Sequence, residues 1–169
     1  MKKLLLFAAL AVFGMGTSFA QGQFKIGANA AIPVGDAGDA YTFGVAADFA
    51  YLFEVADMVW IGPQASYFHY FGDDVEIDTG IGTISGEVED AAFIPIAASG
   101  RVGFGEAFYV GADLGYGIGI SPDGNDGGFY YRPKAGYNFG TVGIIASYSG
   151  VSSDGFTFSS INFGVEFGL

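Results

Sequence analysis

The chain of 169 residues has no cysteine, one histidine and few charged side chains. Without cysteine it can form no disulfide and no thiolate metal site. His69 alone supplies neither a cluster of imidazole ligands nor a convincing base for a Ser-His-acid triad, and we expect it at a membrane interface near Tyr67 and Phe71. Only 14% of residues are charged, against about 25% in an ordinary soluble domain. This profile argues against a cytosolic enzyme.

Positive charge is scarcest of all. Lys and Arg total 6 against 18 Asp and Glu, a net charge of -12. This balance argues against nucleic acid or an anionic membrane surface as the main partner. The Asp123-Gly-Asn125-Asp126 segment has some likeness to a calcium loop, but it lacks the bidentate Glu at the required distance. We therefore expect no metal, no cofactor and no catalytic residues.

The first 20 residues have the pattern of a cleaved secretory signal peptide. Lys2 and Lys3 precede an apolar run over residues 4–13, and Ser18 and Ala20 are the small residues that signal peptidase reads. The apolar run is far shorter than the ~20 residues of a spanning helix. We predict an exported single-domain protein with a signal peptide over residues 1–20 and a mature domain over residues 21–169.

The mature part alternates bulky apolar residues with small or polar ones, which indicates an all-β fold. The last run shows the alternation best, with Ile161, Phe163 and Val165 on one face and Asn162 and Gly164 on the other. The runs are longer than the 5–6 residues typical of soluble strands and fit the roughly 9–11 residues of a membrane-spanning strand. Eight strands are predicted, over residues 24–32, 42–53, 59–71, 92–104, 110–120, 129–139, 142–149 and 161–169.

Short and long connections alternate along the chain. The short ones are residues 54–58, 105–107 and 140–141, and the long ones are 33–41, 72–91, 121–128 and 150–154. This alternation is typical of an eight-stranded antiparallel up-and-down transmembrane barrel with both termini on the periplasmic side. The segment of residues 72–91 is long enough to form a hairpin outside the membrane, in which residues 75–79 would pair with residues 83–88. Pro63, Pro95 and Pro133 should cause bulges or locally interrupted pairing.

The charged residues of the strands fall on the face opposite the bulky apolar one. An eight-stranded barrel has too little interior volume for the bulky face, so we expect that face in lipid and the charges in a narrow lumen, paired with one another. Lys25 and Glu166 should form an ion pair where the first and last strands meet. The predicted lumen charges are Lys25, Asp48, Arg101, Asp113, Arg132, Lys134 and Glu166.

Aromatic residues cluster near both sets of connections, where the interfacial girdles of a membrane barrel belong. Near the short turns lie Phe53, Trp60, Phe104, Phe108, Phe139 and Phe167, and near the long loops lie Tyr67, Tyr70, Phe71, Phe129, Tyr131 and Tyr148.

Across residues 21–169, the FKIGANAAIPVGDAGDAY opening, the eight alternating strands and the INFGVEFGL ending resemble the small outer-membrane β-barrel family of the OmpX and OmpA-barrel types, within the wider porin family. The resemblance implies a monomer in the outer membrane of a Gram-negative cell, in contact with lipid and lipopolysaccharide. It also implies recognition by the outer-membrane assembly machinery, which usually reads a terminal aromatic residue; here Leu169 is terminal and Phe167 lies two positions earlier.

Three functions stay open for such a barrel. The first is a non-enzymatic cell-surface protein that acts through its outer loops in surface structure or adhesion, the second a minor channel for small solutes or ions, and the third a soluble lipocalin-like carrier. The loops could hold divalent ions that bridge to lipopolysaccharide, or a cationic partner. Twelve of the 18 acids lie in the long loops: Asp36, Asp39, Asp73, Asp74, Glu76, Asp78, Glu87, Glu89, Asp90, Asp123, Asp126 and Asp154.

Overall fold

The computed structural model describes residues 22–78, 83–153 and 155–169. The signal peptide predicted over residues 1–20 and its cleavage site lie outside these residues and stay a prediction. No helix among the described residues is long and apolar enough to cross a membrane. The single helical element described is a 3-10 turn, η1 (Gly35–Asp39).

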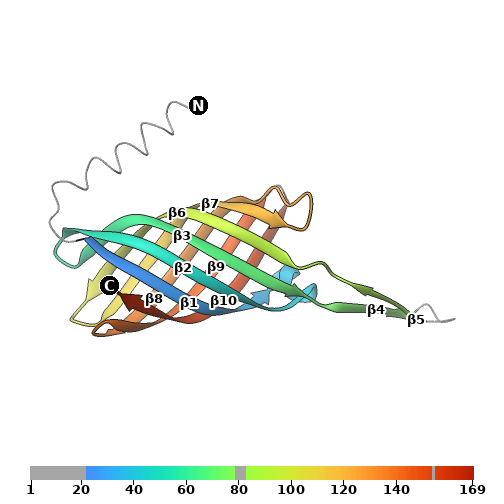
Figure 1. The fold of residues 1–169 in the computed structure, drawn as a ribbon, viewed down its shortest axis with the longest axis horizontal. Coiled ribbons are helices and arrows are strands. Elements are labelled where there is room, and N and C mark those ends of the chain that lie inside the picture. Colours follow the sequence, from blue (N-terminus) through green and yellow to red (C-terminus); the bar gives the residue numbers. More distant parts are fainter. Residues whose placement is uncertain (1–21, 79–82, 154) are drawn as a thin grey trace, which may run out of the picture.

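Eight long antiparallel strands close into a barrel, as the sequence predicted (Figure 1). Each strand pairs with its neighbours along the chain, and β1 closes the barrel against β10. The barrel strands are β1 (Gly22–Val34), β2 (Tyr41–Ala56), β3 (Val59–Gly72), β6 (Ala91–Phe104), β7 (Phe108–Ser121), β8 (Gly128–Phe139), β9 (Val142–Ser153) and β10 (Phe156–Gly168).

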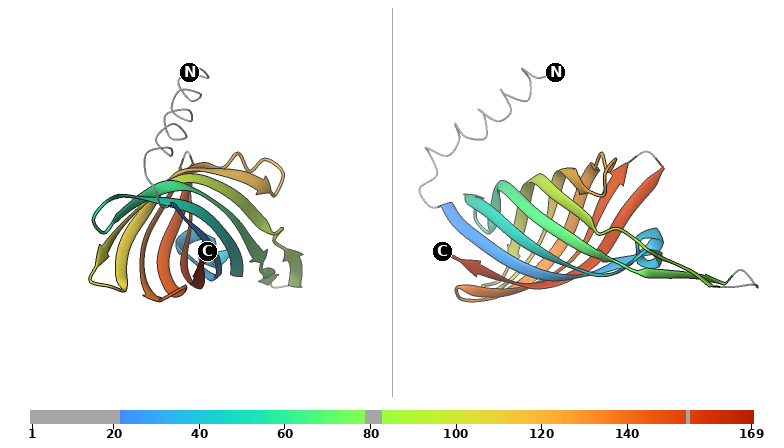
Figure 2. Two further views of the ribbon diagram at one scale, coloured as in Figure 1. Left: turned by 60° about the vertical axis from the view of Figure 1, so that its left-hand side comes forward. Right: turned by 45° about the vertical axis from the view of Figure 1, so that its right-hand side comes forward.

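Between β3 and β6 the chain forms the predicted hairpin. Strands β4 (Asp74–Asp78) and β5 (Thr83–Glu87) make a separate two-stranded sheet in which Ile77 pairs with Ile84. The hairpin projects from the end of the barrel opposite the C-terminus (Figures 1 and 2). We call this end the long-loop end, and the end with residues 57–58, 105–107 and 140–141 the short-turn end.

Alternation places the bulky apolar side chains outside. Leu114 and Phe163 are 54% and 55% exposed, whereas Asp113 and Arg132 are fully buried inside the barrel. Glycines on the inner face leave room for the larger inward residues: a Cβ on Gly136 would lie 2.4 Å from the ring of Tyr109. The apolar exterior is the surface that contact with lipid requires.

One predicted long connection is wrong. Residues 150–153 belong to β9, which pairs with β10 up to the pair of Ser153 with Phe156. The Ser and Gly content of this segment has the composition of a loop. In the barrel, however, Val151 packs in the lumen, and the hydroxyls of Ser152 and Thr157 lie 3.0 Å apart.

The three prolines interrupt pairing on one side of their strands without shifting the register. Between β2 and β3, paired positions pass from Ala50–Gln64 to Phe53–Ile61, skipping Pro63, while Pro63 itself pairs with Ala98 of β6. Pro95 and Pro133 likewise keep a partner on β7 and fall in gaps of the ladder to β3 and β9. The interrupted pairing that we expected is present, because proline has no N–H to donate. Bulges at the prolines are absent, since the register shifts in these ladders lie at other residues.

Candidate functional site

The structure places all seven predicted lumen charges inside the barrel, each at most 8% exposed. They come from β1, β2, β6, β7, β8 and β10. They form three groups along the barrel, and every charged member contacts an opposite charge.

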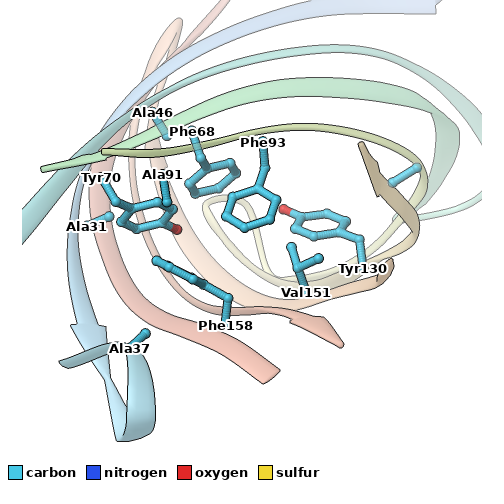
Figure 3. Close-up of a cluster of buried hydrophobic side chains, with 11 residues drawn as sticks. Ala31, Ala37, Ala46, Phe68, Tyr70, Ala91, Phe93, Tyr130, Val151 and Phe158 are labelled. Carbon is cyan, nitrogen blue, oxygen red and sulfur yellow. The ribbon is translucent and has the colours of Figure 1, made fainter. Parts of the chain in front are cut away.

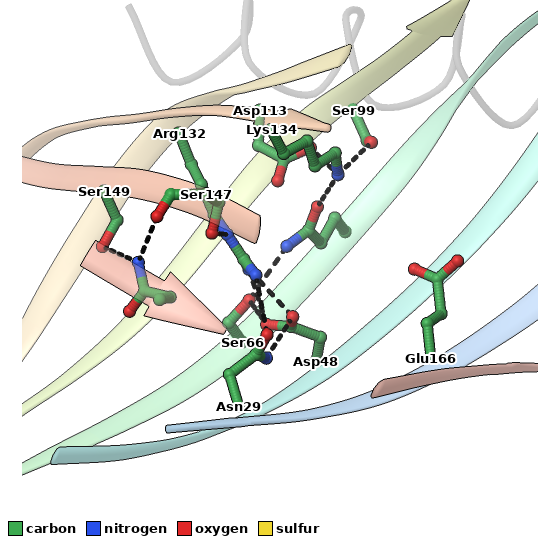
Figure 4. A network of polar contacts seen from close by, with 12 residues as sticks. Asn29, Asp48, Ser66, Ser99, Asp113, Arg132, Lys134, Ser147, Ser149 and Glu166 are labelled. Carbon is green, nitrogen blue, oxygen red and sulfur yellow. Dashed lines mark hydrogen bonds and ion pairs between the residues drawn. The ribbon is translucent and has the colours of Figure 1, made fainter. Parts of the chain in front are cut away.

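The central group is built around Arg132 of β8. Its Nη1 donates to both carboxylate oxygens of Asp48 at 2.9 Å, and its Nε donates to the Ser147 hydroxyl at 2.8 Å (Figure 4). Asp48 also accepts hydrogen bonds from Asn29 at 2.8 Å and Ser66 at 2.7 Å. The pair therefore bridges opposite walls of the barrel and is held in place by neutral donors.

A second group joins Lys134 and Asp113. The Lys134 ammonium lies 2.5 Å from Asp113 Oδ1 and also donates to Ser99 at 3.0 Å and Gln64 at 3.1 Å (Figure 4). Gln64 in turn donates to Ser66 at 3.0 Å. Through Ser66 the second group is connected to the central one, so one polar network fills the middle of the lumen.

The third group lies towards the short-turn end, around Glu166. Arg101 reaches it from β6 with two hydrogen bonds of 2.6 Å. The predicted ion pair between Lys25 and Glu166 is present, but its atoms are 3.9 Å apart. Glu166 stands opposite Gly27, not Lys25, in the β1–β10 register, so the Lys25 contact is diagonal and Arg101, across the lumen, is the principal partner.

The long-loop end of the lumen is filled by aromatic rings, which sequence analysis did not predict. Figure 3 shows the cluster, with Phe68, Tyr70, Phe93, Tyr130 and Phe158 at its centre, each at most 5% exposed. The rings of Tyr70 and Phe158 are 4.5 Å apart between centroids, and those of Phe93 and Phe158 are 5.2 Å apart. We call these five residues the aromatic plug.

A set of neutral polar residues joins the aromatic plug to the ion pairs. The Tyr70 and Ser149 hydroxyls each lie 2.9 Å from that of Ser160. Asn162, fully buried, donates to Ser149 at 3.0 Å and weakly to the carbonyl of Ser147. The change from charged to aromatic filling thus passes through hydroxyls and an amide.

The aromatic girdles need two corrections. Tyr70 is not at the outer interface; it points into the lumen because it continues the inward phase of Gln64, Ser66 and Phe68 on β3. Trp60 shares that phase and lines the lumen mouth at the short-turn end. The other predicted girdle residues are exposed or half-buried on the outside: Phe53, Phe104, Phe108, Phe139, Phe167, Tyr67, Phe71, Phe129, Tyr131 and Tyr148.

The acidic loop residues that the structure describes gather at the long-loop end. Asp36, Asp39, Asp123 and Asp126 are exposed, as are Asp73 and Glu89. Asp74, Glu76, Asp78 and Glu87 belong to the β4–β5 hairpin, and Asp154 lies outside the described residues. Within the described part of the chain, no group of three or more acidic or histidine side chains is arranged to hold a metal ion.

Asp90 is the acidic residue with the most defined role in the loops. Its carboxylate accepts a hydrogen bond from the Gly72 amide at 3.0 Å and lies 3.1 Å from Nε2 of His69. The Ser121 hydroxyl donates to the Asp90 carbonyl at 2.7 Å. His69 therefore helps to fasten the base of the β4–β5 hairpin to the barrel rim.

The sequence matches no family model and no curated protein. Solved structures do match. Ail of Yersinia pestis in a phospholipid nanodisc is 17% identical with a TM-score of 0.56, covering 88% of this chain and all of that one. A structure from the de novo design of transmembrane β-barrels is 7% identical with a TM-score of 0.54, covering 89% and 98%. The chain has the fold of a small eight-stranded outer-membrane barrel.

One further match is the crystal structure of Yersinia pestis Ail in complex with the heparin analogue sucrose octasulfate. It is 17% identical, with a TM-score of 0.54 and coverage of 88% and 97%. At this identity the likeness extends to the fold, which agrees with the resemblance to OmpX-type barrels noted from the sequence.

Proposed function

We propose that the protein is an integral outer-membrane barrel that acts through its surface and not through its lumen. The observation that carries the proposal is the filling of the lumen: two ion pairs occupy the middle, one of them between opposite walls, and the aromatic plug occupies the long-loop end. An eight-stranded barrel leaves little free bore even before such residues are placed in it. A conducting pore would require several of these contacts to break together.

The distribution of charge indicates what kind of partner the surface prefers. Beyond Lys2 and Lys3, the chain has four basic residues, Lys25, Arg101, Arg132 and Lys134, and all four are buried in the lumen. The outer loops therefore carry acids without lysine or arginine. Such a surface repels polyanions, so a heparin-like partner of the kind seen with Ail is not expected for this chain.

The partners consistent with this surface are cationic. They include a basic protein patch in adhesion, and divalent ions that link the acidic loops to the phosphates of lipopolysaccharide. The proposed role is surface structure or adhesion without catalysis, in a monomer facing the cell exterior with its long-loop end. A minor channel for small solutes is the competing function.

Conductance and surface exposure test the proposal together. Purified protein in planar bilayers should conduct little or nothing, because the lumen is filled. Intact cells treated with protease should lose the β4–β5 hairpin while the barrel stays protected. Stable single-channel steps in the nanosiemens range would establish the channel instead. Recovery of the folded protein in the soluble fraction, without detergent, would favour the lipocalin-like carrier.

A further inference from the structure

A recess of about 70 Å³ opens into the lumen at the short-turn end. Its walls come from the first strand, five further strands (β2, β3, β6, β7 and β8) and the turn between β6 and β7. In the proposed orientation it faces the periplasm, away from the acidic loops. Its polar lining consists mainly of Gln23, Lys25, Trp60, Arg101, Tyr109 and Asn138.

Two buried donors of this lining have no hydrogen-bond partner among the described residues: Nε of Arg101 and the hydroxyl of Tyr109. The two residues are 5% and 3% exposed. Both terminal nitrogens of Arg101 donate to Glu166, so Nε is the nitrogen without an acceptor. The guanidinium lies 4.7 Å above the Tyr109 ring, so both groups belong to one corner of the recess. A buried donor without an acceptor is costly. An acceptor that enters the recess would remove that cost once the two side chains turn these atoms, which are closed off from solvent here, towards it.

The buried charge of the recess is positive. Among the lining residues, Lys25 and Arg101 are matched by one buried acid, Glu166, whose two oxygens already accept from Arg101. Asp113, outside the lining, is paired with Lys134. The Lys25 ammonium is 3.9 Å from that carboxylate, beyond hydrogen-bond distance. The one other acid of the lining, Glu106, is exposed at the rim, where water screens it.

The neutral residues of the lining add further donors. The Trp60 indole can only donate, and the amides of Gln23 and Asn138 can donate through their nitrogens. Donors therefore outnumber free acceptors. A cavity needs about 10–15 Å³ to hold one water, so the recess has room for a group of a few heavy atoms.

We propose that this recess binds a small oxyanion, a phosphate or carboxylate group, free or carried by a water-soluble periplasmic molecule. The Tyr109 hydroxyl and Arg101 Nε donate to it, and the Lys25 ammonium balances its charge. The bound group satisfies the two buried donors and offsets the excess positive charge. The site is independent of the outer loops and adds a function on the periplasmic side of a barrel whose outer end is plugged.

Trp60 is the chain's only tryptophan, and it lines the recess, so its fluorescence reports on the site. Full-length protein in an uncharged detergent is titrated with sodium phosphate and with sodium acetate, with sodium chloride keeping the ionic strength constant. The proposal expects a saturable change with at least one of the two oxyanions. No saturable change with either, or the same change with chloride alone, would reject the site. Saturation by free phosphate or acetate at millimolar level identifies the free ion as sufficient; tighter saturation by an organic phosphate than by either free ion would indicate a carrier molecule.

Tyr109→Phe removes the hydroxyl and keeps the ring under Arg101. Loss of a hydrogen bond to a charged group should weaken the apparent Kd roughly ten-fold, and Lys25→Gln should weaken it by a similar factor. Tyr130→Phe is the matched control, because it removes another buried hydroxyl without a partner among the described residues, at the far end of the lumen. It should leave the Kd unchanged. Equal effects of the two tyrosine variants, or no effect of Tyr109→Phe in a heat-modifiable folded protein, would overturn the assignment.

Discussion

The two halves of the lumen are filled by opposite means. From the short-turn end to the middle, four cations and three carboxylates form ion pairs, two of them across the lumen and two between neighbouring strands. The pairs in the middle also form hydrogen bonds with neutral groups. At the long-loop end five aromatic rings pack together with few polar contacts. Charges can be buried at low net cost only where several partners surround each one. The aromatic plug needs no such partners.

The largest effect should follow from breaking the central ion pair. Arg132→Met leaves Asp48 with Asn29 and Ser66 as donors but without its counter-charge. Removing one partner of a buried pair costs about 3–5 kcal/mol. Urea unfolding in lipid vesicles should show a loss of this size.

Neutralising the carboxylate of Asp48, which has lost its counter-charge, provides the control. Asp48→Asn in the Arg132→Met background should recover a large part of the lost stability, since no uncompensated charge remains. A loss below about 1 kcal/mol in the single variant would mean that lumen water solvates Asp48 and that the charged half is not dry.

A smaller loss is expected from the aromatic half. Phe158→Ala removes the ring that contacts both Tyr70 and Phe93. Large-to-small changes of buried Phe cost about 3–5 kcal/mol, and the cost falls where the site can relax. At the mouth of the barrel we expect about 3 kcal/mol or less, measured by the same unfolding experiment.

Phe156→Ala is the matched control for the aromatic half, because Phe156 lies on the same strand and is 45% exposed. It should change stability by no more than about 0.5 kcal/mol. If both phenylalanine variants lose the same amount, the aromatic plug is not a packed core.

The difference between the two halves also explains what the sequence could predict. The alternation of residues predicts the number of strands, their outward face and the seven charged residues inside the lumen. Charge is excluded from lipid, so a charged residue shows which positions of its strand face inward. The aromatic plug has no such mark. Phe68 and Tyr70 are the same residue types that form the outer girdles, and only continuation of the phase from Gln64 and Ser66 would have placed them inside.

The sequence also could not predict which charged residues of the lumen form ion pairs with one another. Lys25 and Glu166 are close in depth, which favoured pairing at the closing seam. Arg101 takes both oxygens of Glu166 because its side chain reaches across the lumen and its planar guanidinium matches a carboxylate. Contacts between opposite walls depend on barrel radius and stagger, which alternation does not encode.

A pair of double-mutant cycles sharpens this point within the charged half. The Arg101–Glu166 cycle, with Arg101→Met and Glu166→Gln, should give a coupling energy of about 1.5–3 kcal/mol, the usual range for hydrogen bonds to charged groups. The Lys25–Glu166 cycle should give less than about 1 kcal/mol, because the atoms are 3.9 Å apart. Equal coupling in the two cycles would contradict the partner assignment.

The smallest effect should come from outside the lumen, at the base of the hairpin. The side chains of His69 and Asp90 are 27% and 46% exposed, and exposed pairs contribute about 0–1 kcal/mol. His69→Ala should therefore leave global stability within about 0.5 kcal/mol of the wild type. Locally, the Gly72 amide, which donates to Asp90, should exchange its hydrogen up to about five-fold faster, as a loss of at most ~1 kcal/mol predicts.

Asp90→Ala distinguishes a fastening of the rim from general loosening. It removes the partner of His69 and also the acceptor of the Gly72 amide. Hydrogen exchange at the Gly72 amide should therefore be faster than in His69→Ala. The amides of β8, which Asp90 does not contact, should stay protected in both variants. Faster exchange throughout the barrel in His69→Ala would mean that the rim contact stabilises the whole fold. That outcome would make the hairpin base part of the same cooperative unit as the aromatic plug, since the plug lies at that end of the lumen and would open with it.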